Sequence, residues 1–162
     1  MSRMRPPQRG RSARARGRRF VILAASFNHP IAEALVRAAA DTLRRHGARP
    51  ADIRVVWVPG AFELPLAAAR ALRRRPRPDG LIAVGALIRG HTSQYLVLAH
   101  AVAQGLMQVA VRQAVPVGFG VIIAERPAQA RARAGRGAGN RGAEAADAVV
   151  AMLPAAGKDR ST

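Results

Sequence analysis

The chain has 162 residues, 49% of them hydrophobic, which is enough for one domain that buries about two-thirds of its unfolded surface. It contains no cysteine, so disulfides, thiolate nucleophiles and cysteine-based metal sites are excluded. The four histidines show no short metal-ligand spacing, and we expect neither a bound metal nor a cofactor. No apolar run reaches the roughly 18 residues of a membrane span, which predicts a soluble, cytoplasmic protein with no membrane partner.

The net charge of +18 is unevenly distributed, because eight of the 27 basic residues lie within residues 1–19. This segment has no acidic residue and no large apolar residue other than methionine, so we predict a disordered arginine-rich tail. We expect a folded domain over residues 20–153 and a flexible C-terminal tail over residues 154–162. The N-terminal tail is either a solvated extension or an arm that binds nucleic acid nonspecifically through its charge.

Apolar runs of strand length alternate with segments of helical periodicity along the rest of the chain. The predicted strands are residues 20–25, 53–57, 80–85 and 116–123. The predicted helices are residues 31–47, 62–74, 92–112 and 142–153. Strands that are apolar along their whole length, and that alternate with helices, are typical of a parallel sheet covered on both faces. We therefore predict an α/β fold, a single-domain α/β/α sandwich of three layers.

The handedness of the connections predicts the order of the four strands. Right-handed crossovers favour the order 2-1-3-4, in which the first and third strands lie side by side and their helices leave toward opposite faces. Ligands bind at such a switch point. The loops that meet there are residues 26–28 and 86–92, and residues 58–63 reach the same edge with the segment after the fourth strand. The sequence therefore places a candidate site at this edge.

The loop after the third strand has more hydrogen-bonding capacity than a connector needs. Gly90 lets the backbone approach a ligand closely, and the backbone amides of His91, Thr92 and Ser93 open a helix, which favours an anion. The alternative is that Thr92 or Ser93 only caps the helix. His91 and Gln94 are three residues apart, so both can face the same side of the first helical turn.

Aromatic, acidic and basic residues occupy the neighbouring loops. Phe62 next to Glu63 suits a flat ligand with hydroxyl or amide groups, unless Phe62 is a core residue and Glu63 is solvated. Phe27 has the same two interpretations, as a ligand contact or as core packing. In residues 129–146 four arginines alternate with glycines, which suits either bidentate phosphate binding or a flexible solvated loop. The spacing matches neither a Walker A loop nor a dinucleotide fingerprint.

Five motifs, taken together and in this order, resemble those of the lumazine synthase family. They are FN (27–28), VPGAFELP (58–65), GALIRGHT (85–92), PVGFGVI (116–122) and RAGRGAGNRGAEAA (133–146). The resemblance covers about residues 20–153 and implies a flavodoxin-like sheet. It implies the condensation of 5-amino-6-(D-ribitylamino)uracil with 3,4-dihydroxy-2-butanone 4-phosphate to 6,7-dimethyl-8-ribityllumazine, the penultimate step of riboflavin biosynthesis. It also implies pentamers, sometimes joined into icosahedral shells, with active sites between neighbouring subunits, and riboflavin synthase as a candidate partner.

The resemblance implies a role for several residues of these motifs. Phe27 would stack on the pyrimidine. Ala61, Phe62 and Glu63 would contact the uracil and ribityl groups. Ala86, Leu87 and Ile88 would line the same pocket. The backbone amides of His91 and Thr92 would bind the phosphate together with Arg133. Phe119 would complete the pocket, and some of these residues would come from the adjoining subunit.

The chain departs from the family pattern at one position that matters for catalysis. Where the family has a histidine that donates and accepts protons, two residues after Thr92, this chain has Gln94. Gln94 does not titrate and cannot act as a general acid or base, and His91 is a candidate substitute. Two hypotheses follow. The chain is either an active enzyme with altered proton transfer or a catalytically impaired paralogue that acts as an oligomeric shell or binds flavin precursors.

Overall fold

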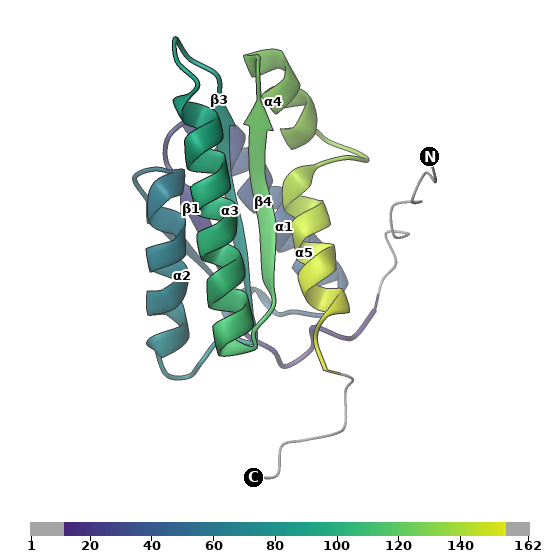
Figure 1. Ribbon diagram of the computed structural model, residues 1–162. Helices are drawn as coiled ribbons and strands as arrows, with labels where there is room; N and C mark the ends of the chain where they lie inside the picture. The colour runs from purple at the N-terminus through teal and green to yellow at the C-terminus, as the bar shows by residue number, and fades with distance from the viewer. Residues whose placement is uncertain (1–11, 155–162) are drawn as a thin grey trace, which may run out of the picture.

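The computed structural model describes residues 12–154 and folds them into three layers (Figure 1). The central sheet contains β1 (Phe20–Ala25), β2 (Ile53–Val58), β3 (Gly80–Ile88) and β4 (Val117–Ala124). One face is covered by α2 (Leu64–Arg73) and α3 (Gln94–Gln113), and the other by α1 (His29–Arg45), α4 (Pro127–Ala134) and α5 (Arg141–Ala151). Two 3-10 turns, η1 (Pro50–Asp52) and η2 (Ala61–Glu63), precede β2 and α2.

The sheet has the strand order β2-β1-β3-β4, and every pair of neighbouring strands is parallel. Phe20 of β1 lies opposite Ile53 of β2 on one side and Gly80 of β3 on the other. The predicted fold class and strand order are therefore confirmed. Because β1 and β3 are neighbours and are followed by helices on opposite faces, the switch point lies between their carboxyl ends.

The central strands are buried on both faces, which explains their continuous apolar sequence. All six residues of β1 are buried, and they alternate between two cores. Toward α1 and α5 the strand contributes Phe20, Ile22 and Ala24. Toward α2 and α3 it contributes Val21, Leu23 and Ala25. The sheet is thus a fixed platform, and the loops at its carboxyl edge are held by strands that cannot shift without exposing one of the two cores.

The segment between β4 and α5 is more helical than the sequence indicates. Residues 127–134 form α4, whereas we predicted a last helical region with its main part at residues 142–153 and either a phosphate-binding or a flexible loop in residues 129–146. Pro127 occupies the first turn, and the side-chain carbonyl of Gln129 accepts hydrogen bonds from the backbone N–H groups of Glu125 (2.9 Å) and Arg126 (3.1 Å). This local capping starts the helix. Residues 135–140 remain a loop.

Residues 12–19, which the sequence analysis assigned to the N-terminal tail, pack against the domain. Ala15 is fully buried, and its N–H donates a hydrogen bond of 2.9 Å to the carbonyl of His46. The guanidinium of Arg14 donates to the carbonyl of Leu153 at 2.7 Å, and this contact satisfies a carbonyl just beyond the end of α5. The folded part of the chain therefore begins before residue 20. The rest of the predicted tails, residues 1–11 and 155–162, lies outside the described residues.

His46 joins three distant parts of the chain. One ring nitrogen, Nδ1, lies 2.7 Å from the hydroxyl of Ser12, and the other, Nε2, lies 2.9 Å from a carboxylate oxygen of Asp147 on α5. The side chains of His46 and Asp147 are both largely buried. The N-terminal segment is thus fastened to the end of α1 and to α5 at once.

Between residues 12 and 154, α3 is the one helix long and apolar enough to cross a membrane. Length and composition alone are weak evidence, because core helices of water-soluble proteins meet the same criteria. One stripe of α3, formed by Tyr95, Ala99, Val102 and Leu106, is buried, and Val102 and Leu106 belong to the core between this helix and the sheet. The helix therefore has a place in the three-layer fold, and its other apolar side chains, among them Val97, Met107 and Val111, are exposed.

Candidate active site

The loops at the carboxyl ends of β1, β2 and β3 are tied together by hydrogen bonds. The N–H of Ser26 donates to the carbonyl of Val58 (2.8 Å), and the N–H of Phe27 donates to the carbonyl of Pro59 (3.2 Å). The side chain of Asn28 donates to the carbonyl of Ala86 (3.1 Å). Three loops that are far apart in the sequence therefore form one surface at the switch point, as the strand order requires.

Two aromatic side chains project from this surface. Phe27 is 73% exposed and Phe62 is 63% exposed, which excludes, within the single chain, the alternative that they are ordinary core residues. Ala61 is buried below them. The carboxylate of Glu63 accepts a hydrogen bond of 3.1 Å from the N–H of Gly60, so the turn holds this side chain in place. An exposed aromatic face beside an oriented carboxylate can bind a flat ligand that carries hydrogen-bonding groups.

The end of β3 supplies the next part of the same surface. Ala86 is buried, while Leu87 and Ile88 are half-buried. These three apolar residues lie one strand away from the loop of Phe27, because β1 and β3 are paired. Ala86 and Ile88 pack in the core on the α1 and α5 side of the sheet, and Leu87 packs in the core on the α2 and α3 side.

The loop before α3 is open to solvent. Residues 89–94 are all exposed, and α3 begins at Gln94 with no side-chain hydrogen bond from its N-cap, Ser93. The hydroxyl of Thr92 accepts a hydrogen bond of 3.3 Å from the N–H of Gln94. Of the two residues that the sequence offers as helix caps, Thr92 therefore accepts a hydrogen bond from the helix and Ser93 does not. The first turn of α3 still presents backbone N–H groups and the positive end of a 20-residue helix to a ligand.

Phe119 and Arg133 lie on the β4 side of the sheet, away from Phe27 and Phe62. Phe119 belongs to β4, which forms the edge of the sheet opposite β2, and it pairs with Ala83 in the middle of β3. Its side chain is 39% exposed and lines a hollow of about 700 Å³ together with Arg133 and Arg141. One chain therefore carries Phe119 and Arg133 on the β4 side of the sheet and Phe27 and Phe62 at the ends of β1 and β2, with the end of β3 between them.

Two asparagines organise the site in a way that the sequence analysis did not assign. Asn28 adopts left-handed backbone angles (φ 59°, ψ 48°) at the start of α1. Asn140 is buried, and its side-chain oxygen accepts from the N–H groups of Gly142 (2.9 Å) and Ala143 (3.1 Å), while its amide donates to the carbonyls of Ala134 and Gly135. An asparagine directly before a segment of helical periodicity is a recognised N-cap signal, and this signal predicts the role of Asn140 at the start of α5.

One ion pair shifts the pKa values of both its members, and it lies beside the sheet rather than in the site. The Arg49 guanidinium holds the pKa of Asp52 below its ordinary value, chiefly through hydrogen bonds of 2.7 and 3.2 Å. The same contact raises the pKa of Arg49. Over residues 12–154, no group of His, Asp and Glu side chains has the arrangement of a metal site.

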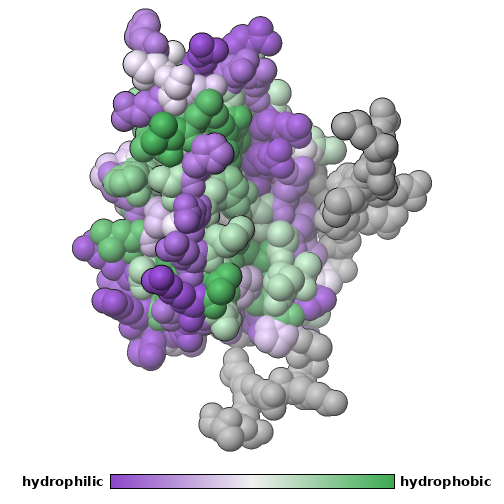
Figure 2. Space-filling model, viewed as in Figure 1, coloured by the Kyte–Doolittle hydropathy of each residue, from purple (hydrophilic) through white to green (hydrophobic). Residues whose placement is uncertain are grey.

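Apolar side chains are exposed over the face that carries α3 and β4. In Figure 2, hydrophobic surface is scattered over this face between polar residues. The exposed apolar residues on these two elements are Leu96, Val97, Met107, Val111, Phe119 and Ile123. Apolar surface of this kind is typical of protein–protein contacts, and it gives α3 a reason to be apolar on its outer side.

Comparison with known proteins gives one consistent family. The model for 6,7-dimethyl-8-ribityllumazine synthase matches residues 17–156. A protein of that name from Thermus thermophilus is 42% identical over 139 residues, which cover 86% of this chain and 88% of the relative. Relatives of the same name from Chlorobium phaeobacteroides (43% over 142 residues, 88% and 91% covered) and Halorhodospira halophila (44% over 135 residues, 83% and 86% covered) are similarly close.

Proposed function

The chain belongs to the 6,7-dimethyl-8-ribityllumazine synthase family, and from this premise we propose how its residues carry out the family's reaction. The reaction condenses 5-amino-6-(D-ribitylamino)uracil with 3,4-dihydroxy-2-butanone 4-phosphate and releases phosphate and water. This makes the chain a transferase of riboflavin biosynthesis. The observation that carries the proposal is the single surface formed by the ends of β1, β2 and β3, on which the motifs at residues 27–28, 58–65 and 85–92 lie.

The pyrimidine substrate is assigned to the aromatic part of this surface. Phe27 stacks on the pyrimidine ring, and the turn of Ala61, Phe62 and Glu63 contacts the uracil and ribityl groups. The high exposure of Phe27 and Phe62 supports this assignment, because exposed aromatic side chains on a rigid turn are costly unless something covers them. The residues at the end of β3, Ala86, Leu87 and Ile88, line the pocket wall.

The phosphate of the second substrate is assigned to the loop before α3. The backbone amides of His91 and Thr92 donate to the phosphate oxygens at the positive end of the helix. Arg133 supplies a guanidinium that forms charge-assisted hydrogen bonds with the same group. The exposed loop and the N-terminus of α3, where Ser93 makes no side-chain cap, support this role.

The complete site requires two copies of the chain. Phe119 and Arg133 lie at the β4 edge, whereas Phe27 and Phe62 lie at the end of the sheet that includes β2. A neighbouring subunit can bring its β4 edge to this end and so complete the pocket. We assign the protein to a cytoplasmic homopentamer, with further assembly into a shell as its larger form, and the apolar face of α3 and β4 supports subunit contact.

Further partners follow from the pathway and from charge. Riboflavin synthase, which uses the product, is a candidate partner of the assembly. The arginines of residues 1–11 would attract nucleic acid without sequence preference.

Loss of the family histidine reduces catalysis without removing it. General acid–base catalysis contributes about 10² to 10⁴ in rate, whereas positioning two reactants contributes roughly 7 to 11 kcal/mol. Because Gln94 occupies the histidine position, the proton is transferred by solvent, by the substrate or by His91. The motifs that carry the other proposed site residues match the family, so we assign the chain to the active enzymes of the family.

The decisive experiment is the rate of lumazine formation by the purified protein, measured by absorbance against the uncatalysed reaction of the same two substrates. Turnover above background, lost in Arg133→Met and in Phe27→Ala, is the expected result. A background rate with retained binding of the pyrimidine substrate would contradict the enzyme assignment and identify a catalytically impaired paralogue. Mixing Phe27→Ala with Arg133→Met protein tests the shared site, because mixed assemblies contain some pockets with both residues intact.

A further inference from the structure

The only tryptophan of the chain, Trp57, stacks on His29 at the border of the proposed pocket. The two ring centroids are 4.6 Å apart and the ring planes are inclined by 35°, and this separation is typical of favourable ring pairs. His29 is the first residue of α1, and Trp57 lies near the end of the edge strand β2. The stack therefore joins a helix to an edge strand, and the proposed reaction assigns no role to either residue.

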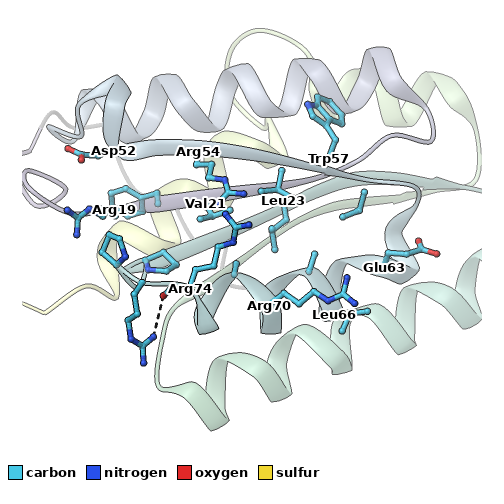
Figure 3. A pocket seen from close by; sticks show the side chains of 18 of the residues that line it. Arg19, Val21, Leu23, Asp52, Arg54, Trp57, Glu63, Leu66, Arg70 and Arg74 are labelled. Carbon is cyan, nitrogen blue, oxygen red and sulfur yellow. Dashed lines mark hydrogen bonds between the residues drawn. The ribbon is translucent and has the colours of Figure 1, made fainter.

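The alternation of side chains along β2 directs Trp57 toward α1. Val56 and Val58 pack in the core on the α2 and α3 side of the sheet, whereas Ile53 packs on the α1 and α5 side. Trp57 follows Ile53 by an even number of positions and so shares its face. Figure 3 shows the same arrangement, since the side chains of Trp57 and Arg54 point to opposite sides of β2.

Phe27 lies between two connections to the end of β2. On one side, its own N–H donates a hydrogen bond of 3.2 Å to the carbonyl of Pro59. On the other side, the chain turns into α1 and the ring of His29 returns to Trp57. Because Phe27 is 73% exposed, packing of its own ring does not determine its direction within the chain. That direction depends on these two connections, which both lead to the strand and turn that carry Phe62.

His29 has a second contact, with Glu33 one turn further along α1. Its Nε2 lies 3.3 Å from one carboxylate oxygen of Glu33, and the other oxygen lies 4.0 Å from the guanidinium of Arg37. All three side chains are substantially exposed, and exposed pairs at this spacing contribute little to stability. The contact with Glu33 also stays within one helix, so the stack with Trp57 is the contact that joins His29 to the end of β2.

We propose that His29 is a positioning residue for the pyrimidine substrate, which stacks on Trp57 and thereby holds Phe27 beside the turn of Phe62. This inference rests on the proposed function, in which Phe27 stacks on the pyrimidine ring. Both rings of the pair belong to one chain, so a neighbouring subunit that covers this end of the sheet leaves the stack in place. The proposed phosphate loop follows β3 and is held by other elements, so the stack acts on one of the two substrates.

The test measures binding of the pyrimidine substrate to the full-length protein by equilibrium dialysis, together with kcat and both KM values for lumazine formation. His29→Ala and Trp57→Leu are each expected to weaken pyrimidine binding about three- to tenfold, the strength of a ring pair. Each should raise the KM for the pyrimidine with little change in kcat or in the KM for the butanone phosphate. His29→Phe keeps a ring on Trp57 and should restore most of the affinity. Glu33→Gln removes the ion pair, keeps the stack and should bind like wild type.

Near-ultraviolet circular dichroism tests the stack itself, because Trp57 is the only tryptophan and its signal depends on fixed packing. His29→Ala should weaken the tryptophan bands, and Glu33→Gln should leave them unchanged. If Trp57→Leu does not fold, the comparison of His29→Ala with His29→Phe decides alone.

Two results would overturn the inference. One is a pyrimidine affinity that stays unchanged in His29→Ala, and the other is an equal loss of affinity in Glu33→Gln, which would assign the effect to the ion pair. Dialysis does not require turnover. A wild-type protein that binds the pyrimidine without catalysing the reaction would therefore contradict the enzyme assignment, while the loss of affinity in His29→Ala would still support the positioning role.

Discussion

The side-chain amide of Asn28 donates a hydrogen bond of 3.1 Å to the carbonyl of Ala86. This bond crosses from the loop after β1 to the end of β3, the two strands between which the switch point lies. Asn28 also has left-handed backbone angles, which asparagine and glycine tolerate better than other residues. One residue therefore fixes both the direction of Phe27 and the spacing of two walls of the proposed pocket.

Substitution at Asn28 separates these two effects. Asn28→Ala loses the hydrogen bond and strains the backbone, so we expect it to lower the free energy of unfolding by about 1 to 3 kcal/mol. Asn28→Gly loses only the hydrogen bond and is expected to be less destabilised. Urea denaturation gives the stabilities, and both variants should raise the KM for the pyrimidine substrate. Equal stability of the two variants would show that the left-handed backbone carries no strain.

Restoring the family histidine should accelerate the reaction. We expect Gln94→His to raise kcat by about 10² or more, because it returns a titratable group to the first turn of α3. If His91 now transfers the proton, His91→Ala lowers kcat in wild type but has little effect in the Gln94→His background. An unchanged kcat in Gln94→His would mean that proton transfer does not limit turnover. Single-turnover kinetics separate this result from slow product release.

Substitution of Gly90 should weaken ligand binding without lowering the stability of the fold. A Cβ at Gly90 would meet no atom within 4 Å, so Gly90→Ala is expected to change stability by no more than about 0.5 kcal/mol. It should raise the KM for the butanone phosphate about tenfold or more, since the backbone of this loop approaches the phosphate. Gly142→Ala is the contrasting variant, because its Cβ would clash with the backbone carbonyl of Leu35. That variant should lose about 1 to 3 kcal/mol of stability.

The N-terminal segment should stabilise the domain through Arg14. Arg14→Ala removes hydrogen bonds to the carbonyls of Ala151 (3.3 Å) and Leu153 (2.7 Å), and we expect a loss of about 1 kcal/mol. Arg16 is exposed and its side chain makes no such contact, so Arg16→Ala removes the same charge as a control. Thermal denaturation of the two variants tests this role. Equal melting temperatures would show that the contact with the end of α5 contributes nothing.

The Arg49–Asp52 pair should make stability depend on pH. The pKa of Asp52 is lowered in the folded protein, mainly by its hydrogen bond with Arg49. The pair therefore stabilises the fold fully above the ordinary aspartate pKa of about 3.9, and this contribution is lost as the pH falls through the lowered value. The difference in unfolding free energy between wild type and Asp52→Asn should shrink in that range. A difference that stays constant with pH would contradict the assignment.

The periodicity of apolar residues was sufficient to predict the sheet and its order. Each strand of the sheet interior is apolar along its length because helices cover both faces, and right-handed crossovers then leave few arrangements. The motifs around Phe27, Phe62 and Thr92 were also recognisable in the sequence, since they occupy loops that must meet at the switch point. Motifs of this kind can be identified from residues that are close in the sequence, without information on long-range contacts.

Only the tertiary structure decided the features that depend on contacts between distant residues. The exposure of Phe27 and Phe62, the bond from Asn28 to Ala86, and the fastening of Arg14 to Leu153 cannot be read from spacing. Composition and periodicity determine which faces are buried, whereas the direction of an exposed side chain depends on the neighbours that packing brings to it.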